Sequence, residues 1–196
     1  PTWTWQWITV LGDERVPFAL SLFMARHRPR VFWALVLAAL LAFAFTRGLK
    51  PLLDLPRPPA LLGPDEIHLI GPALRRSSFP SGHSVAAGVF FGVLAYYSRR
   101  PVTRALWVVT ALLVGLSRVA VGVHWPLDAA FGLFGGVLAA WAGCRLAARW
   151  WRLAQDASVH LAFVTFACFL TLTLTYWDGG YTLARPLLTT IGWGAL

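Results

Sequence analysis

Charged side chains are scarce in this chain, since only 13% of its 196 residues are Asp, Glu, Lys or Arg. A soluble domain usually carries about a quarter of charged residues. Hydrophobic residues make up 58% of the chain, and its mean hydropathy is +0.63. This balance excludes an ordinary soluble domain and predicts an integral membrane protein, in which each remaining charge needs its own explanation.

Acidic residues and cysteines are also few. The eight Asp and Glu face 17 Lys and Arg, which gives a net charge of +9. The basic residues lie between apolar segments, as in loops at a lipid surface, and no basic stripe with interleaved aromatics indicates a nucleic-acid partner. Both cysteines lie inside apolar runs, so neither a disulfide framework nor a cysteine metal site is expected. No cleavable signal peptide is recognisable at the start.

Apolar segments recur along the whole chain and predict about six transmembrane helices. They cover residues 16–25, 32–46, 81–97, 102–116, 127–144 and 157–177, and the first is short for a span of roughly 20 residues. Residues 2–10 predict an interfacial segment or the beginning of the first helix. We therefore expect an all-α integral membrane helical bundle that forms a single domain over residues 1–196. Gly132, Gly135 and Gly136 would let their helix approach its neighbours closely.

The arginines of three short turns indicate how the bundle sits in the membrane. These are Arg26, Arg28, Arg30, Arg99, Arg100, Arg104, Arg145, Arg149 and Arg152. The positive-inside rule operates best on short loops, so we place these turns in the cytoplasm. The long proline-rich loop over residues 51–79 is then expected outside. A loop of this length is more often functional or disordered than a plain connector.

The stretch from Ser117 to Asp128 carries the first candidate for chemistry. His124 and Asp128 are four residues apart, so a helix would place them on one face, and Pro126 suits the first turn of such a helix. Asp128 could fix one imidazole nitrogen and leave the other as a nucleophile. Arg118 would be a fixed counter-charge for a phosphate. The alternative is an ordinary polar loop between two helices.

Lys50 and Arg57 form a second candidate cluster. The segment between them contains Pro51 and Pro56, which predicts a stiff, irregular turn rather than a continuing helix. Such a turn could hold two cations at a fixed separation for a multiply charged oxyanion. The alternative is a pair of basic residues that snorkel at a helix end.

The third cluster is Pro80-Ser81-Gly82-His83. If a helix begins near Ser81, its hydroxyl and the first backbone amides form an anion site, and His83 could protonate a leaving oxygen. The alternative is an ordinary helix start in which the histidine only caps the chain.

The alternation of spans puts all three clusters at the same membrane face. Together they supply three cations, a hydroxyl with backbone amides, two histidines and one aspartate. They lack the grouped carboxylates of a Mg²⁺ site and the Cys/His spacing of a zinc site, so no metal and no other cofactor is expected.

Lys50-x6-Arg57-Pro58, Pro80-Ser81-Gly82-His83 and Ser117-Arg118-x5-His124-x3-Asp128 resemble, in order, the three signature motifs of the type-2 phosphatidic acid phosphatase superfamily. That superfamily also includes bacterial acid phosphatases and vanadium haloperoxidases. The resemblance implies a metal-independent membrane lipid phosphatase with a phosphohistidine intermediate. It makes His124 the nucleophile, Asp128 its orienting partner and His83 the acid. By the same resemblance the phosphate is held by Lys50, Arg57, Arg118, Ser81 and the Gly82 amide.

The expected function is removal of phosphate from a membrane lipid at the non-cytoplasmic face of a bacterial inner membrane. Compact relatives act on undecaprenyl pyrophosphate, phosphatidylglycerol phosphate, phosphatidic acid or lipid A phosphates, and undecaprenyl pyrophosphate is the first candidate. Two alternatives stay open: a phosphotransferase that passes the group to a second lipid, and a non-catalytic member that binds or transports lipid. The partners expected are the lipid substrate and the bilayer.

Overall fold

The computed structural model describes residues 2–63 and 65–176, and every regular element in these ranges is a helix. The helices are α1 Thr2–Val10, α2 Arg15–His27, α3 Pro29–Leu53, α4 Pro58–Leu61, α5 Gly82–Tyr97, α6 Pro101–Ala120, α7 Pro126–Arg149, α8 Trp151–Ala154 and α9 Ala157–Tyr176. The prediction of an all-α chain is confirmed. α3, α6 and α7 each begin at a proline, which fits the first turn of a helix, so they start before the predicted apolar runs; they also end after those runs.

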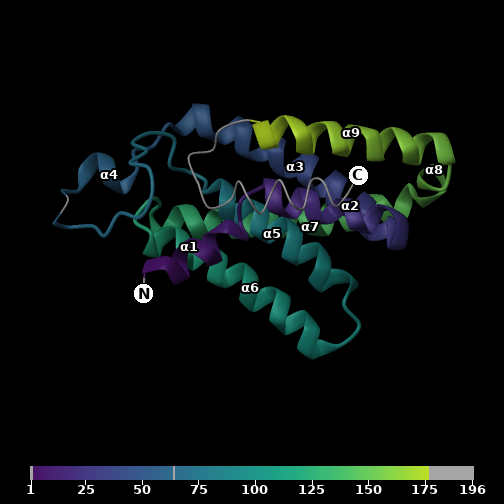
Figure 1. Ribbon diagram of the computed structural model, residues 1–196, viewed down its shortest axis with the longest axis horizontal. Helices are drawn as coiled ribbons and strands as arrows, with labels where there is room; N and C mark the ends of the chain where they lie inside the picture. Colours follow the sequence, from purple (N-terminus) through teal and green to yellow (C-terminus); the bar gives the residue numbers. More distant parts are fainter. Residues whose placement is uncertain (1, 64, 177–196) are drawn as a thin grey trace.

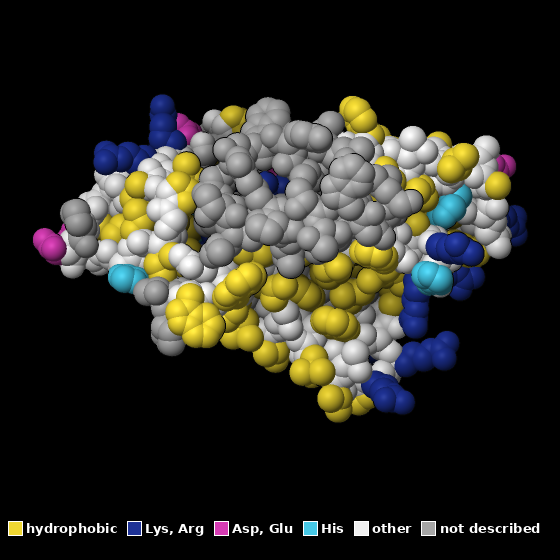
Figure 2. Space-filling view, in the orientation of Figure 1, with side chains coloured by type: hydrophobic (Ala, Val, Ile, Leu, Met, Phe, Trp, Pro, Cys, Tyr) yellow, Lys and Arg dark blue, Asp and Glu magenta, His cyan; other side chains and the backbone are white. Residues whose placement is uncertain are grey.

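Three helical stretches are long and apolar enough to cross a membrane: Pro29–Leu61, Pro101–Ala120 and Pro126–Arg149. Gly82–Tyr97 and Ala157–Phe169 are shorter apolar helices. On α6, apolar side chains at helical spacing are exposed, among them Leu106 and Leu113. Figure 2 shows many hydrophobic side chains gathered over this part of the molecule. Such a surface fits contact with lipid, and the protein is an integral membrane protein.

The predicted irregular turn between Lys50 and Arg57 is wrong in its first half. α3 continues through Pro51 and ends at Leu53, so Lys50 belongs to the helix. Pro51 removes only one backbone hydrogen bond, and the helix needs just one more turn. Asp54 then ends α3 in a left-handed conformation, with its N–H donating to the Lys50 carbonyl at 3.0 Å.

α7 is the central helix and packs against both α3 and α5 (Figure 1). Its small residues permit this, as the sequence predicts. A side chain at Gly143 would lie 2.7 Å from the Ala34 carbonyl oxygen on α3, and one at Gly132 would lie 2.7 Å from the Ser81 carbonyl oxygen at the start of α5. The helices therefore meet backbone to backbone, which needs glycine at the contact.

The two ends of the bundle differ in chemistry. The C-terminal end of α3, the start of α5 and the α6–α7 turn lie at the end that carries α4 (Figure 1). The short arginine-rich turns lie at the other end, where α8 is, and basic side chains gather there on the face shown in Figure 2. The structure thus confirms the prediction that the three motif clusters lie at the same end of the helical bundle.

We expect Gly136→Ala to destabilise the protein by about 1–3 kcal/mol, as overpacking in a core does. The new methyl group would overlap the Val85 carbonyl oxygen and lie 2.9 Å from the Gly88 Cα, both on α5. Gly48→Ala is the matched control, because nothing lies within 4 Å of its added methyl group and alanine favours a helix. Thermal unfolding in detergent measures both. Equal melting temperatures for the two variants would contradict the close packing of α5 and α7.

Candidate active site

Backbone and side-chain hydrogen bonds tie the proline-rich loop to the α6–α7 turn. The Trp125 indole N–H donates to the Pro56 carbonyl at 3.0 Å, and the Ile70 N–H donates to the Val121 carbonyl at 3.0 Å. The Ser81 N–H donates to the Asp128 carbonyl at 3.1 Å. These contacts join segments that are far apart in sequence, and they hold the motif clusters next to one another.

His124 and Asp128 lie together in the buried interior, each 3% exposed. His124 precedes α7, and Asp128 is in the first turn of that helix. The His124 Nδ1 is 3.4 Å from the Asp128 Oδ2. A carboxylate accepts hydrogen bonds, so the imidazole proton belongs on Nδ1 and the lone pair on Nε2.

Arg57 lies against the other side of the same imidazole. Its Nη1 is 3.3 Å from the His124 Nε2. Backbone carbonyls of three residues accept hydrogen bonds from the guanidinium: Arg76 at 2.9 Å, Val123 at 3.4 Å and Ser77 at 3.5 Å. A fixed cation beside a nucleophilic nitrogen is suited to an anionic group that the nitrogen attacks.

His83, Lys50 and Arg118 complete the cluster. His83 interacts electrostatically with Arg118, His124, Lys50 and Arg57, and Lys50 interacts with both arginines. The structure therefore brings together both predicted histidines and all three predicted cations. Three cations and two imidazoles at one place, with Arg57, Arg118 and His124 buried, favour an anionic ligand.

Ser81 and Gly82 lie at the start of α5, where the sequence predicts a helix N-terminus. Ser81 is the N-cap, and its Oγ accepts from the Ser84 N–H at 3.4 Å and from the Ser84 hydroxyl at 3.0 Å. Its own hydroxyl hydrogen can still be donated. No atom lies within 4 Å of an added Cβ at Gly82, so open space adjoins this first turn. An oxyanion can approach the backbone amides there.

The pKa of His124 is lowered to about 4, chiefly by burial; Asp128 opposes this shift, and the nearby guanidinium groups of Arg57 and Arg118 add to it. The imidazole is therefore neutral at physiological pH, and its Nε2 lone pair is available.

Ser78 is a site residue that the sequence alone did not reveal. Its hydroxyl donates to the Asp128 Oδ2, and its Oγ is 3.5 Å from the His124 Nδ1. The Trp125 N–H donates to the same Asp128 oxygen at 2.9 Å. Little in the sequence indicates this role, because Ser78 lies two residues before the predicted cluster, in a loop without periodicity.

The end of α1 and the turn that follows it also adjoin the site, which the sequence did not predict. The Arg118 Nη1 donates to the Thr9 Oγ1 at 2.5 Å, and both residues are 2% exposed. Gly12 packs on His83, since a Cβ there would lie 3.0 Å from the His83 carbonyl oxygen. A buried ion pair between Asp13 and Arg15, at 2.6 Å, closes this turn. Gly12 and Asp13 can be read in the sequence, but no sequence pattern predicts that this turn contacts α5 or α6.

Comparisons with known proteins agree with these motifs. The sequence profile of the PAP2 superfamily matches residues 31–152. Lipid A 1-phosphatase of Rhizobium etli is 45% identical over 60 residues, which are 30% of this chain and 25% of the relative. Undecaprenyl-diphosphatase of Sulfolobus acidocaldarius is 28% identical over 129 residues, which are 64% of this chain and 58% of the relative. The matches thus span a quarter to somewhat over half of these relatives' lengths.

A solved structure is similar in fold as well. The crystal structure of Aquifex aeolicus LpxE superposes with a TM-score of 0.67 and 30% sequence identity, covering 74% of this chain and 85% of that chain. The residues from Lys50 to Asp128 lie inside the matched profile, whereas Thr9 and Gly12 precede it.

We expect the stability of the protein to fall as the pH is lowered from about 6.5 to about 4. The folded pKa of His124 is about 4 against an ordinary value of 6.5, so the unfolded chain binds the additional proton in this window. The contribution is fully present above pH 6.5 and is lost as the pH falls towards 4; it amounts to roughly 3 kcal/mol. Melting temperatures across this range measure it.

His124→Gln should flatten the acid limb of that profile, because glutamine does not titrate. His27→Gln is the control, since His27 is an exposed histidine at the end of α2. An unchanged acid limb in His124→Gln would contradict the burial of a neutral imidazole at this position.

Proposed function

The chain belongs to the PAP2 superfamily, and on this premise we propose that residues 1–196 form one membrane-embedded domain that hydrolyses a lipid phosphate or pyrophosphate through a phosphohistidine. The observation that carries the proposal is the arrangement around one imidazole. Asp128 lies on the Nδ1 side of His124 and Arg57 lies on the Nε2 side. A histidine held in this way has a basic nitrogen directed at a cation that can hold the phosphate it attacks.

In the first step the His124 Nε2 attacks the phosphorus atom. A P–N bond forms while the bond from phosphorus to the leaving oxygen breaks. His83, in its protonated form, donates a proton to that oxygen, so the lipid leaves as an alcohol or a monophosphate. The imidazole of His124 becomes positively charged, and the Asp128 carboxylate stabilises this charge.

In the second step water attacks the phosphorus of the phosphohistidine. His83, now neutral, accepts a proton from the water, and the P–N bond breaks. Inorganic phosphate is released, and His124 returns to its neutral form. Both histidines are then back in their starting protonation states, and the reaction has consumed only the lipid and water.

The cations hold the phosphate through both steps. Lys50, Arg57 and Arg118 face charge that develops on the phosphoryl oxygens, and the Ser81 hydroxyl and Gly82 amide donate hydrogen bonds at the start of α5. Arg57 and Arg118 are in place before the substrate arrives, because the Arg76 carbonyl holds the first and the Thr9 hydroxyl holds the second. Fixed donors cost little reorganisation during the reaction.

The substrate enters from the bilayer with its tail among the apolar helices, in a bundle of about six membrane segments. The arginine-rich turns lie in the cytoplasm of a bacterium, so the site faces outward from the inner membrane. The names of the relatives support two substrate classes, lipid A phosphates and undecaprenyl pyrophosphate. Undecaprenyl pyrophosphate remains the first candidate.

Phosphate release by the purified protein from a panel of lipid phosphates and pyrophosphates tests the function. Release from at least one of these lipids is expected. A labelled acceptor lipid in the same assay distinguishes transfer from hydrolysis. Binding of the lipids without any release or transfer would overturn the enzymatic proposal.

We expect His124→Ala to lower turnover by at least about 10³-fold, the scale on which loss of a nucleophile acts. The variant should keep its fold and still bind the lipid phosphate, because the three cations are unchanged. Phosphate release is the measurement, and His27→Ala at the opposite end is the control. Near-normal release by His124→Ala would remove the nucleophile assignment.

Thr9 is proposed as a positioning residue for Arg118. Its hydroxyl oxygen is a buried acceptor for the guanidinium, and hydrogen bonds to charged groups contribute about 1.5–3 kcal/mol. Thr9→Val has the same shape but lacks the acceptor. It should lower kcat/KM on the order of tenfold and weaken inhibition by vanadate, an analogue of the attacked phosphate.

Thr9→Ser is the matched variant, because it keeps the hydroxyl and loses only a methyl group. It should retain most of the activity and of the vanadate inhibition. A Thr9→Val enzyme with unchanged kcat/KM, alongside an active wild type, would show that Thr9 only packs against α6.

A further inference from the structure

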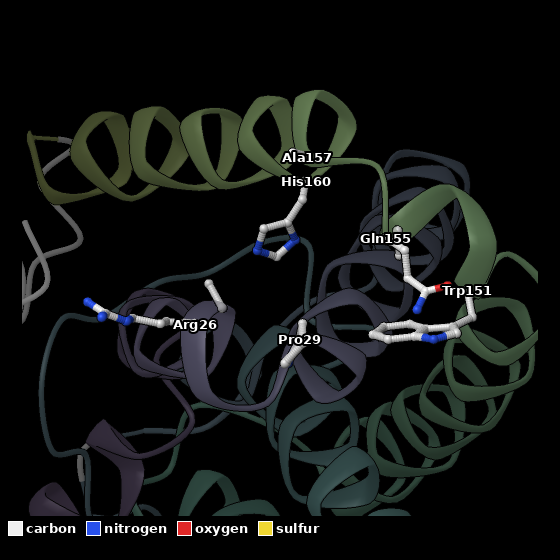
Figure 3. Close-up of a pocket in the computed structure, with 8 residues that line it drawn as sticks. Arg26, Pro29, Trp151, Gln155, Ala157 and His160 are labelled. Carbon is white, nitrogen blue, oxygen red and sulfur yellow. The ribbon is translucent and has the colours of Figure 1, made fainter.

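A cavity of about 480 Å³ lies far from the candidate active site, where the α2–α3 corner meets the α8–α9 corner. Pro29, which lines it, is at the first residue of α3, whereas Lys50 is near the last, so roughly 30 Å of helix separates the two places. Figure 3 shows His160 projecting from α9 towards the cavity, with Trp151 and Gln155 on another side of it.

Arg26, Gln155 and His160 supply N–H donors to the lining of this cavity, and none of the eight lining residues is acidic. The Trp33 indole N–H donates to the His160 Nδ1 at 3.1 Å. Nδ1 is therefore an acceptor, and the ring proton lies on Nε2, where it can be donated. The lining thus favours a negatively charged ligand.

Neighbouring charges act in the same direction. The Arg30 guanidinium stacks over the ring of Trp151 at 4.5 Å, which brings a second cation to the cavity wall. Asp156 is the acidic residue nearest in sequence to the lining residues, and its carboxylate forms hydrogen bonds at the start of α9. Its Oδ1 accepts from the Ser158 N–H at 2.9 Å and from the Val159 N–H at 3.3 Å, so it caps the start of α9.

The remaining surroundings are apolar and suit a lipid better than a free anion. Ala25, Pro29 and Ala154 complete the lining, and the volume far exceeds that of one phosphate ion. Apolar side chains on the adjoining helices are exposed, with Phe23 of α2 at 46% and Leu161 of α9 at 65%. Basic pockets between membrane helices bind anionic headgroups.

We propose that this cavity binds the phosphodiester headgroup of an anionic phospholipid, with the acyl chains against the exposed apolar side chains of α2 and α9. The lipid joins the α2–α3 corner to the α8–α9 corner and stabilises the docking of α9. A phosphodiester lacks the terminal phosphate that the candidate active site would remove, so this ligand is not a substrate. The proposal therefore stands or falls independently of the phosphatase activity.

The test uses the full chain, purified in detergent, with dioleoyl phosphatidylglycerol and dioleoyl phosphatidylcholine as probes. Native mass spectrometry measures lipid binding, and thermal unfolding measures stabilisation. Phosphatidylglycerol should bind more tightly than phosphatidylcholine and raise the melting temperature more. Arg26→Gln/Arg30→Gln should weaken phosphatidylglycerol binding by about 30-fold, since each basic residue near a membrane surface contributes about fivefold.

Arg99→Gln/Arg100→Gln is the matched control, because it removes two exposed arginines from the α5–α6 turn at the same end. It should bind phosphatidylglycerol as the wild type does. Equal weakening in both double variants would show general attraction to the basic end and would overturn the site. Equal stabilisation by the soluble headgroup glycerophosphoglycerol would assign the cavity to a free anion and would overturn the lipid proposal. Arg26→Gln alone leaves the Arg30–Trp151 stacking unchanged, so it tests the site even if the double variant misfolds. It should weaken phosphatidylglycerol binding about fivefold.

Discussion

The Asp128 carboxylate is the contact on which the site depends. One of its oxygens accepts hydrogen bonds from the Ser78 hydroxyl and the Trp125 N–H and lies 3.4 Å from the His124 Nδ1. It therefore ties the loop before α5 to the first turn of α7 and fixes the orientation of the imidazole at the same time. Loss of this carboxylate would remove the hydrogen bond that joins Ser78 to α7 and the acceptor beside the imidazole Nδ1.

The site gathers like charges at a cost to stability. Arg57 and Arg118 are buried, at 7% and 2% exposed, and Lys50 interacts with both. Burial of cations near one another opposes folding unless hydrogen bonds compensate. Backbone carbonyls compensate at Arg57, and the Thr9 hydroxyl compensates at Arg118. A phosphate would add negative charge beside these cations, so binding of the substrate and stability of the protein are coupled.

Close helix packing gives this arrangement its geometry. Gly132 lets α7 lie against the start of α5, since a Cβ added there would be only 2.7 Å from the Ser81 carbonyl oxygen. At that distance the Ser81 N–H can donate to the Asp128 carbonyl at 3.1 Å. The helix start that would bind an oxyanion is thereby joined to the turn that carries His124. A larger residue at position 132 would separate the two halves of the site.

The sequence by itself determined the helical class, the approximate positions of the long helices and the clustering of the three motifs at one end. Apolar length and the alternation of spans carry that information locally. It did not determine the end of α3, because a single proline near a helix end costs too little to stop the helix. Only the tertiary structure decided that Ser78 bonds to Asp128 and Thr9 to Arg118. Those contacts join residues 50 and 109 positions apart, and no local pattern in the chain encodes such pairs.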